Sequence, residues 1–539
     1  MSFDLIPEPQ SVTLNGEAAD SDDAGAPVPV ALPLVGRISE DRDIDDIAGV
    51  FPTQLADDIE AATGLRWDIA SDVMVAGLPA PNAAIAHPVP PHASCWKSFI
   101  TLRLDPSSLE PQEYRLTIAR SGIDVVGGDT EGVRNGVQTL RQIIRQCAPA
   151  LPRLVIADKP AYKVRGYYLD ATRGRVPTLD WLKTWADRLC LYKYNQLQLY
   201  IEHTFMFDDL SETWRGTSPL KPADIIAFDE YCARLGIELV PSVSTFGHQY
   251  MAMRTRELRH LGEFPEDADR RYGFVERQRH HTLNITEPES LAFSFKLIDA
   301  YMQLFRTRKF NICGDETFDL GRGRSKPEAE RRGVAAMYAD FVSQLCRHLS
   351  ERGREPMFWG DIAVEMPQIL GLLPDNVTLL NWLYAPGIGE DKVRLVAQAG
   401  APQYVCSAVW CWNALLPRLD DSWNNISRLA RYGVKYGAVG YLVTDWGDYG
   451  HVNDPRMAVS GMIFGAQCAW NPMAHIQGEA GCGDGEEGSA AGYADAAADV
   501  VRENKAAADG DSPAPLPSSS ESDDYTGGAA AAIAEIGRA

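Results

Sequence analysis

Eight short apolar segments, most of them followed by an amphipathic one, constrain the fold of residues 164–444 more than any other feature. Their lengths suit buried β-strands, and the segments between them have helical periodicity. This alternation predicts an α/β fold in which eight parallel strands close into a (β/α)8 TIM barrel. The predicted strands are Val164–Asp170, Asn195–Glu202, Glu238–Ser244, Phe310–Asp315, Pro356–Gly360, Val377–Tyr384, Gln403–Trp410 and Val439–Thr444.

Helix signals between the strands agree with this alternation. Thr178 is a good N-cap for a helix over residues 179–189, because its hydroxyl can accept a hydrogen bond from the first turn. Pro222 suits the first turn of the next helix, and Gly236 suits its C-terminal end. A doubly wound open sheet is the competing fold. It is disfavoured because no Gly-x-Gly-x-x-Gly turn follows an early strand.

The N-terminal part of the chain has a different pattern. A strand at 113–119, a hairpin partner at 122–127 and a helix at 130–147 predict a small α+β domain over residues 1–160. The first 45 or so residues of this domain are expected to be partly irregular, because they are rich in Asp, Ala and Pro.

The barrel domain is predicted over residues 161–477, and a tail follows at 478–539. The tail is acidic and rich in Ala, Gly and Ser. Such a composition cannot bury enough apolar surface to offset its ordering entropy, so the tail is predicted to be disordered.

The net charge and the cysteine pattern limit which partners and which cellular compartment the sequence predicts. The chain has 51 Lys and Arg against 74 Asp and Glu, hence a net charge of −23. This predicts no nucleic-acid and no membrane partner, because both favour basic surfaces, and it suits a neutral substrate such as a sugar. No targeting or membrane-spanning segment is visible, and the 10 cysteines contain no Cys-x-x-Cys pair. These features predict a cytoplasmic protein with reduced thiols.

Two adjacent acids, Asp315 and Glu316, end the fourth predicted strand. In a barrel, the C-terminal ends of the strands carry the catalytic groups. Neighbouring carboxylates repel each other, so one tends to keep its proton near neutral pH, as a general acid must. Adjacent strand residues point to opposite faces, so the pair can share a substrate only if the chain bends, which Gly314 favours. The alternative is that the pair only begins a loop or caps a helix.

The residues that follow the other strands favour the catalytic interpretation. They combine aromatic rings with carboxylates, a mixture that suits sugars, whose C–H faces stack on indoles and whose hydroxyls bind charged groups. They include Arg173, Glu202, His203, His248, Trp359, Asp361, Trp382, Tyr384, Trp410, Trp412, Trp446 and Asp448.

Several of these segments resemble glycoside hydrolase family 20, the β-N-acetylhexosaminidases, over roughly residues 50–475. The matching segments are Arg165–Arg173, Asn195–Tyr200, Phe310–Glu316 and Trp446–Asp448 in the barrel, with Glu113–Leu116 and Gly132–Leu140 before it. Trp412-Asn413 and Thr444–His451 resemble the exo-N-acetylglucosaminidase branch. The resemblance implies that the small N-terminal domain has the fold called zincin-like. Because the chain has no His-Glu-x-x-His motif, no metal or other cofactor is expected.

The resemblance implies an exo-acting, retaining enzyme in which the substrate's own acetamido oxygen attacks the anomeric carbon. Glu316 would then protonate the leaving oxygen, and Asp315 would hold the acetamide N–H and stabilise the oxazolinium ion. Hydroxyls would be bound by Arg173 and Asp448. The remaining implied binding residues are Trp359, Trp412 and Trp446 around the acetamide, Tyr384 at its oxygen, with Trp382 or Tyr404 as competitors, and His248 from a Gly-His pair.

One departure from the family pattern concerns His248. Many members have a Glu and an Asp shortly before this Gly-His, whereas here residues 241–246 contain no carboxylate, so the orientation of His248 stays open. His280-His281 is predicted to be an exposed loop pair rather than a metal site, since no third ligand lies at a useful spacing.

Two alternatives remain at this stage. One is a two-carboxylate retaining glycosidase, with Glu316 as acid and Asp361 or Asp448 as nucleophile. The other is a sugar-binding barrel without catalysis. The implied partner is an N-acetylated oligosaccharide or glycoconjugate. The sequence does not separate GlcNAc from GalNAc and leaves the oligomeric state open, although a homodimer is compatible with a barrel that carries exposed loops.

Overall fold

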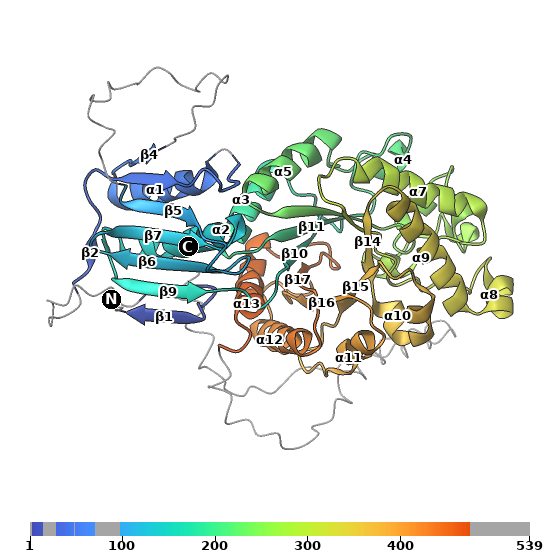
Figure 1. Cartoon of the computed structure of the whole chain (residues 1–539). Helices are drawn as coiled ribbons and strands as arrows, with labels where there is room; N and C mark the ends of the chain where they lie inside the picture. The colour runs from blue at the N-terminus through green and yellow to red at the C-terminus, as the bar shows by residue number, and fades with distance from the viewer. Residues whose placement is uncertain (1–2, 15–27, 48, 71–97, 475–539) are drawn as a thin grey trace, which may run out of the picture.

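The computed structural model describes residues 3–14, 28–47, 49–70 and 98–474. The tail predicted at 478–539 lies outside these residues. In the described chain, an open sheet with two helices lies beside a closed barrel surrounded by helices (Figure 1). The segment between strands β9 and β10 connects the two parts.

Eight parallel strands close the barrel in chain order, which confirms the predicted fold class. The barrel closes where the first strand pairs with the last, with Tyr168 opposite Thr444. The strands are β10 (Arg165–Asp170), β11 (Gln196–Ile201), β12 (Glu238–Val243), β13 (Lys309–Asn311), β14 (Glu355–Trp359), β15 (Thr378–Trp382), β16 (Gln403–Ala408) and β17 (Gly440–Asp445).

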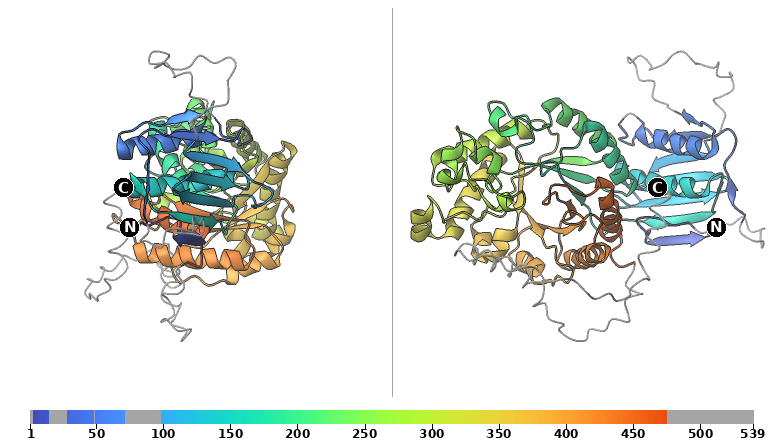
Figure 2. Two further views of the ribbon diagram at one scale, coloured as in Figure 1. Left: turned by 60° about the vertical axis from the view of Figure 1, so that its left-hand side comes forward. Right: turned by 180° about the vertical axis from the view of Figure 1, so that it is seen from behind.

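Helices cover the outside of the barrel, so its strands are buried on both faces, as their continuous apolar runs indicate (Figure 2). Thr178 caps the first helix by accepting a hydrogen bond from the Trp181 backbone, and Pro222 begins α5, both as predicted. The helices are α3 (Leu179–Leu191), α4 (Ser211–Trp214), α5 (Pro222–Arg234), α6 (Tyr250–Met253), α7 (Pro288–Met302), α8 (Lys326–Arg332), α9 (Val334–Glu351), α10 (Asp361–Glu365), α11 (Asp391–Gln398), α12 (Leu419–Lys435) and α13 (Val459–Trp470). Short 3₁₀ helices are η2 (Arg259–Leu261), η3 (Pro265–Asp267), η4 (Glu276–Arg279), η5 (Pro367–Leu372) and η6 (Pro455–Ala458).

The fourth barrel strand is shorter than predicted. It was expected to run to Asp315, but β13 ends at Asn311. The physical reason is that Cys313 and Gly314 have φ angles of 60° and 80°, which no strand contains. The Asn311 side chain accepts a hydrogen bond from the Cys313 backbone at 2.9 Å, so the chain leaves the sheet at this point.

The N-terminal sheet has seven strands in the order β1-β9-β6-β7-β5-β3-β4. The predicted hairpin is present as an antiparallel β6–β7 pair, and the predicted helix spans Thr130–Cys147 as α2. The elements of this part are β1 (Ser11–Leu14), β2 (Val30–Ala31), β3 (Arg37–Glu40), α1 (Val50–Thr63), β4 (Asp68–Ala70), β5 (Ile100–Leu104), β6 (Tyr114–Ala119), β7 (Gly122–Gly127), α2, β8 (Ala150–Leu151) and β9 (Leu154–Asp158).

Buried polar contacts join the sheet to the barrel. Arg134 of α2 donates to the carbonyl oxygens of Tyr194, Leu235 and Gly236, which belong to barrel loops. Trp470 of α13 is fully buried against the core of the sheet, and its indole N–H lies 2.9 Å from a carboxylate oxygen of Asp158. The Arg134 contacts hold α2 against the segments that precede β11 and β12, and the Trp470 contact holds α13 against the N-terminal sheet.

Within the described residues, no helix is long and apolar enough to cross a membrane. The eight cysteines among the described residues are free thiols, and Cys190, Cys232 and Cys406 are buried as expected. Cys95 and Cys482 lie outside the described residues.

Candidate active site

The two acids face the same imidazole ring. After β13, positive φ angles at Cys313, Gly314 and Glu316 turn the backbone, so Asp315 and Glu316 do not point to opposite sides. His248 Nε2 lies 3.4 Å from Asp315 Oδ2 and 3.6 Å from Glu316 Oε2. Non-glycine residues rarely adopt such φ angles, and they persist where the surroundings hold them. The bend that the shared site requires is therefore present.

Three neighbouring elements hold this turn in place. Tyr338 of α9 donates a hydrogen bond to the Gly314 carbonyl at 2.7 Å. The Glu316 backbone N–H donates to Asp361 Oδ2, at the start of α10, at 3.2 Å. Gly247, after β12, packs so closely that an added Cβ would lie 2.5 Å from the Asp315 carbonyl oxygen. The positions of both carboxylates therefore depend on α9, the start of α10 and the loop after β12.

His248 is a buried cation beside the acid pair. Its Nδ1 lies 3.0 Å from the Gln278 carbonyl, which can only accept, so Nδ1 carries a proton. Burial and Arg173 oppose a second proton, but Asp315 and Glu316 outweigh them and raise the pKa of His248 to about 9. The Gln278 carbonyl therefore settles the orientation that residues 241–246 left open.

Glu316 is set up to hold a proton. Burial raises its pKa, and the neighbouring Asp315 raises it further, while His248 and Arg173 act in the opposite direction. Its side chain is still 34% exposed, so its carboxyl group can be reached from solvent. A carboxyl group with a raised pKa at an accessible position can donate a proton near neutral pH.

Arg173 lies at the centre of a buried ion cluster. Its side chain is 5% exposed, with Nε 3.0 Å from Glu202 Oε1 and Nη1 2.5 Å from Asp448 Oδ1. Burial alone would raise the pKa of Glu202, but His203 and Arg173 lower it well below its usual range. Asp170 accepts hydrogen bonds from the backbone N–H of Arg173 and of Gly447, which ties the loop after β10 to the loop after β17.

The predicted aromatic residues pack against one another beside the Arg173 ion cluster. Tyr384 accepts a hydrogen bond from the Trp446 indole at 2.8 Å, and its ring lies 5.6 Å from that of Trp412. Trp359 is fully buried and packs 5.7 Å from Trp446. Trp382 and Tyr404 were the alternatives to Tyr384 as donor to the acetamide oxygen. The Trp382 ring stacks on the Tyr384 ring, with 5.0 Å between their centres. Tyr404 instead pairs with Gly440 at the amino-terminal start of β17.

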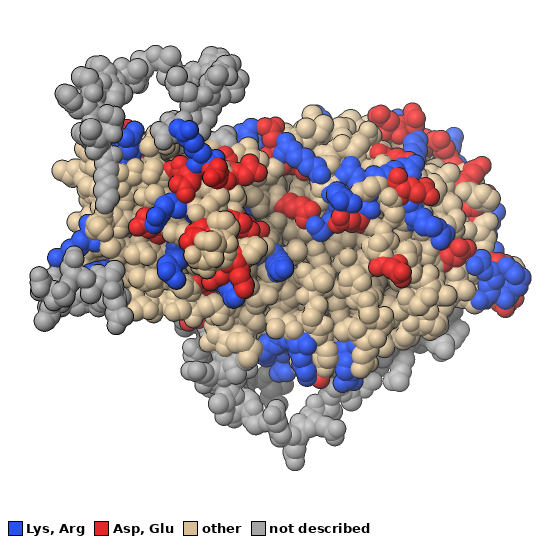
Figure 3. Space-filling model, viewed as in Figure 1, with Lys and Arg blue, Asp and Glu red and all other residues tan. Residues whose placement is uncertain are grey.

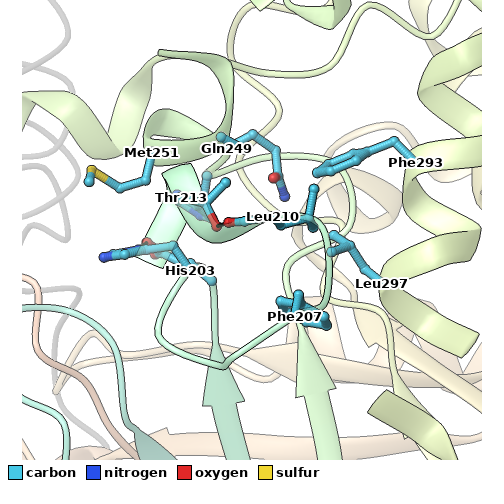
Figure 4. Close-up of a pocket in the computed structure, with 11 residues that line it drawn as sticks. His203, Phe207, Leu210, Thr213, Gln249, Met251, Phe293 and Leu297 are labelled. Carbon is cyan, nitrogen blue, oxygen red and sulfur yellow. Dashed lines mark hydrogen bonds and ion pairs between the residues drawn. The ribbon is translucent and has the colours of Figure 1, made fainter. Parts of the chain in front are cut away.

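Two recesses lie side by side at the carboxyl ends of β11 and β12. They share Glu202, His248 and Met251. The first is lined mainly by apolar side chains from the β11 loop and α7, and Figure 4 shows His203 and Met251 on the opposite side from Phe293. The second is lined by Arg173, Glu202, His248, Tyr250, Met251, Arg277 and Gln278.

The loop between β12 and α7 contributes residues to the site that the strand ends did not indicate. Gln278 accepts from His248 and also donates its side-chain amide to the Asp448 carbonyl at 2.6 Å. Arg277 faces the second recess. Neither residue follows a strand directly, so no local signal marks it. The prediction that His281 is exposed was wrong: it is 5% exposed and stacks on Tyr250, because the loop folds back over the strand ends.

On the face of the molecule seen in Figure 3, acidic and basic side chains are interspersed over both parts. Among the described residues, no group of three or more His, Cys, Asp or Glu side chains is placed to hold a metal ion.

Comparison with protein families matches most of the described chain. Residues 162–412 match the glycosyl hydrolase family 20 catalytic domain, and residues 43–159 match domain 2 of the same family. The two matched ranges cover most of the barrel and of the sheet with its helices.

Comparison with individual proteins gives distant relatives. A lacto-N-biosidase of Bifidobacterium bifidum is 26% identical over 315 residues, which are 55% of this chain and 26% of that protein. A β-hexosaminidase of Akkermansia muciniphila is 30% identical over 341 residues, 57% of this chain and 65% of that protein. The chain thus spans less than two thirds of the length of either relative.

Solved structures show the same fold. A β-N-acetylhexosaminidase from Bacteroides fragilis superposes with a TM-score of 0.64 at 17% identity, covering 93% of this chain and 95% of that one. An exo-β-N-acetylglucosaminidase from Vibrio harveyi in complex with N-acetylglucosamine gives 0.65 at 16% identity, covering 87% of this chain and 74% of that one.

Proposed function

The chain belongs to glycosyl hydrolase family 20, and from this premise we propose that it is an exo-acting, retaining β-N-acetylhexosaminidase. It would remove terminal β-linked GlcNAc or GalNAc from an oligosaccharide or glycoconjugate. The observation that supports this most is the acid pair, in which Asp315 and Glu316 lie against one buried imidazolium. The relative named β-hexosaminidase and the fold neighbour crystallised with N-acetylglucosamine point to the same class of substrate.

The proposed reaction has two steps, and the protein supplies no nucleophile. In the first, the acetamido oxygen of the substrate forms a bond to C1 while the bond from C1 to the leaving oxygen breaks. Glu316 gives its proton to that oxygen, and Asp315 holds the acetamide N–H and offsets the positive charge of the oxazolinium ring. In the second step, Glu316 removes a proton from water, whose oxygen bonds to C1 and reopens the ring with overall retention.

The ion cluster and the aromatic group would bind the sugar around this centre. Arg173 and Asp448 are close enough to form one bidentate site for ring hydroxyls. Trp446 lies beside the guanidinium and would stack on the sugar face. Tyr384 is bonded to Trp446 and would donate to the acetamide oxygen. Trp359 and Trp412 would enclose the acetamide with them.

Substrate assistance is favoured over a two-carboxylate scheme by the contacts of the two alternative nucleophiles. Asp361 accepts the Glu316 backbone N–H, and burial raises its pKa well above the usual range, which suits a neutral group rather than an anionic nucleophile. Asp448 is paired with Arg173. Neither carboxylate is thus free to attack a sugar carbon.

A thiazoline mimic of the cyclised acetamide distinguishes the two schemes. We expect it to inhibit hydrolysis of 4-nitrophenyl N-acetyl-β-D-glucosaminide competitively, binding roughly 100-fold or more tightly than free GlcNAc, because it resembles the transition state. We also expect little hydrolysis of the matching glucoside, which lacks the acetamido group. Efficient glucoside turnover without thiazoline inhibition would favour the two-carboxylate scheme. The matching galactosaminide, assayed in parallel, measures the preference for GalNAc.

The pH dependence of kcat/KM tests the pairing of Glu316 with His248. Glu316 must be protonated to act as an acid, and its raised pKa places the basic limb of the profile above its ordinary value of 4.5. The His248 cation lowers the pKa of Glu316, so His248→Gln should raise it and move this limb to higher pH. His260→Gln is the control, since His260 pairs with Glu289 and is 49% exposed. An unchanged basic limb in His248→Gln would contradict the pairing.

A further inference from the structure

Arg277 carries a positive charge that the active site does not use. It lies on η4 and faces the second recess together with Arg173, Glu202 and His248. Its guanidinium carbon lies 4.0 Å from the centre of the Phe274 ring and 5.5 Å from that of Tyr250. Within the described part of the chain, the Arg277 side chain makes no direct hydrogen bond or close ion pair, and Glu202 is the carboxylate whose charge acts on it most. Its direct contacts are therefore with aromatic rings rather than with a carboxylate.

The carboxylates near this recess are already paired with other cations. Glu202 Oε1 accepts from Arg173 Nε and from the Tyr200 hydroxyl, each at 3.0 Å, and Glu202 Oε2 lies 3.7 Å from His203 Nδ1. Asp448 pairs with Arg173, and the acid pair faces His248. Burial lowers the pKa of Arg277 and outweighs the opposing charge of Glu202, which is shared with Arg173 and His203, so the guanidinium is left incompletely compensated.

We propose that Arg277 binds an anionic substituent, such as a sulfate, phosphate or carboxylate group, on the terminal sugar of the substrate. The proposal rests on the proposed function, because the recess adjoins Arg173 and His248 of the same site. A guanidinium presents parallel N–H donors that match such groups bidentately. Phe274 and Tyr250 hold the guanidinium plane in advance, so little side-chain entropy is lost on binding.

The overall charge of the chain makes this local cation more significant. A net charge of −23 repels an anionic substrate at long range. An enzyme with this negative net charge that accepts acidic sugars therefore needs a cationic side chain where the anionic group of the sugar binds. Arg173 and His248 make close ion pairs with carboxylates of the protein, whereas Arg277 makes no such direct pair among the described residues.

Binding measurements test the proposal without relying on turnover. Titration calorimetry compares GlcNAc with its 3-, 4- and 6-O-sulfates, GlcNAc 6-phosphate and N-acetylmuramic acid, whose carboxylate is attached at O3. We expect the wild type to bind at least one of these anions more tightly than GlcNAc. Arg277→Gln should reduce that preference about 10- to 100-fold, the range of a charge-assisted hydrogen bond. The series of probes also identifies which anionic group, and which position, is recognised.

Arg279→Gln is the matched control. Arg279 lies two residues away at the end of the same η4 helix and is exposed, so its substitution should leave the preference unchanged. Arg277→Lys keeps the positive charge but lacks the planar guanidinium that binds an anion through two N–H groups. It should retain part of the preference for the anionic sugar. The proposal is overturned if the wild type shows no preference for any anion, or if Arg277→Gln keeps the wild-type preference.

Turnover separates this proposal from the proposed function. With 4-nitrophenyl glycosides of the preferred acidic sugar and of GlcNAc, Arg277→Gln should lower the ratio of the two kcat/KM values by a similar factor. If the wild type hydrolyses neither glycoside, the proposed function fails, and the binding ratios still decide the role of Arg277. If it hydrolyses the GlcNAc glycoside and the ratio does not respond to Arg277→Gln, only the present proposal fails.

Discussion

Replacing Glu316 by glutamine should lower kcat/KM for N,N′-diacetylchitobiose by roughly 10²–10⁴-fold, the usual contribution of general acid catalysis. The glutamine keeps the size of the side chain but has no proton to give to the leaving oxygen. The loss should be smaller for 4-nitrophenyl N-acetyl-β-D-glucosaminide in the step that breaks the glycosidic bond, because nitrophenolate leaves without a proton. Initial rates on both substrates provide the measurement.

The control for this substitution is Glu365→Gln. Glu365 is exposed at the end of α10 and should tolerate the change, so the activity of this variant should equal that of the wild type. Equal melting temperatures of both variants and the wild type would exclude unfolding as the cause. If the wild type binds the substrate yet turns it over no faster than Glu316→Gln, the protein is a sugar-binding barrel rather than a hydrolase.

Replacing Arg173 by methionine should destabilise the protein by about 3–5 kcal/mol at pH 7, the range for removing one partner of a buried ion pair. Arg173 is 5% exposed, and its loss leaves Glu202, itself 11% exposed, without its main cation. Asp448 and Asp170 lose the same partner. Urea unfolding monitored by tryptophan fluorescence measures the difference, and activity should fall as well, because Arg173 is proposed to bind ring hydroxyls.

The effect should depend on pH in a defined direction. The folded-state pKa of Glu202 lies below its unfolded value of 4.5, so Glu202 contributes stability above pH 4.5 that is lost as the pH falls through the folded-state value. Arg173→Met removes much of that contribution. The difference in the free energy of unfolding between wild type and variant should therefore become smaller as the pH is lowered below 4.5. Arg173→Lys retains the charge and should lose less stability. If this difference in the free energy of unfolding instead grew at low pH, the ion cluster around Arg173 would not be stabilised by charge.

Much of the fold was predictable because its signals are local. Buried strands of a barrel are continuous apolar runs, and their helices begin at residues such as Thr178 and Pro222, whose capping chemistry acts within one turn. All eight predicted strands are present in the barrel. The end of β13 was predicted wrongly because Ile312 and Cys313 are as apolar as a strand requires, while the positive φ of Cys313 is imposed by its neighbours.

The candidate site was predictable to the extent that its residues follow strands. Arg173, Asp315, Glu316 and Asp448 lie within a few residues of the ends of their strands. In the structure they belong to one network of contacts with His248 and Glu202, which Gln278 connects. Their catalytic and binding roles stay predictions until the variants are measured. Gln278 and Arg277 escaped prediction because a long loop of 3₁₀ turns brings them to the site, and such a loop has no periodicity to follow.

The sequence by itself determined which chemical groups are present and at which end of the barrel they emerge, because strand period and chain direction are local properties. The tertiary structure alone decided the charge states of those groups. Burial raises the pKa of Glu316, whereas charged groups on other loops overcome burial to raise the pKa of His248 and to lower that of Glu202. These interactions act through distances of a few ångströms between residues far apart in the chain, and only the folded protein sets those distances.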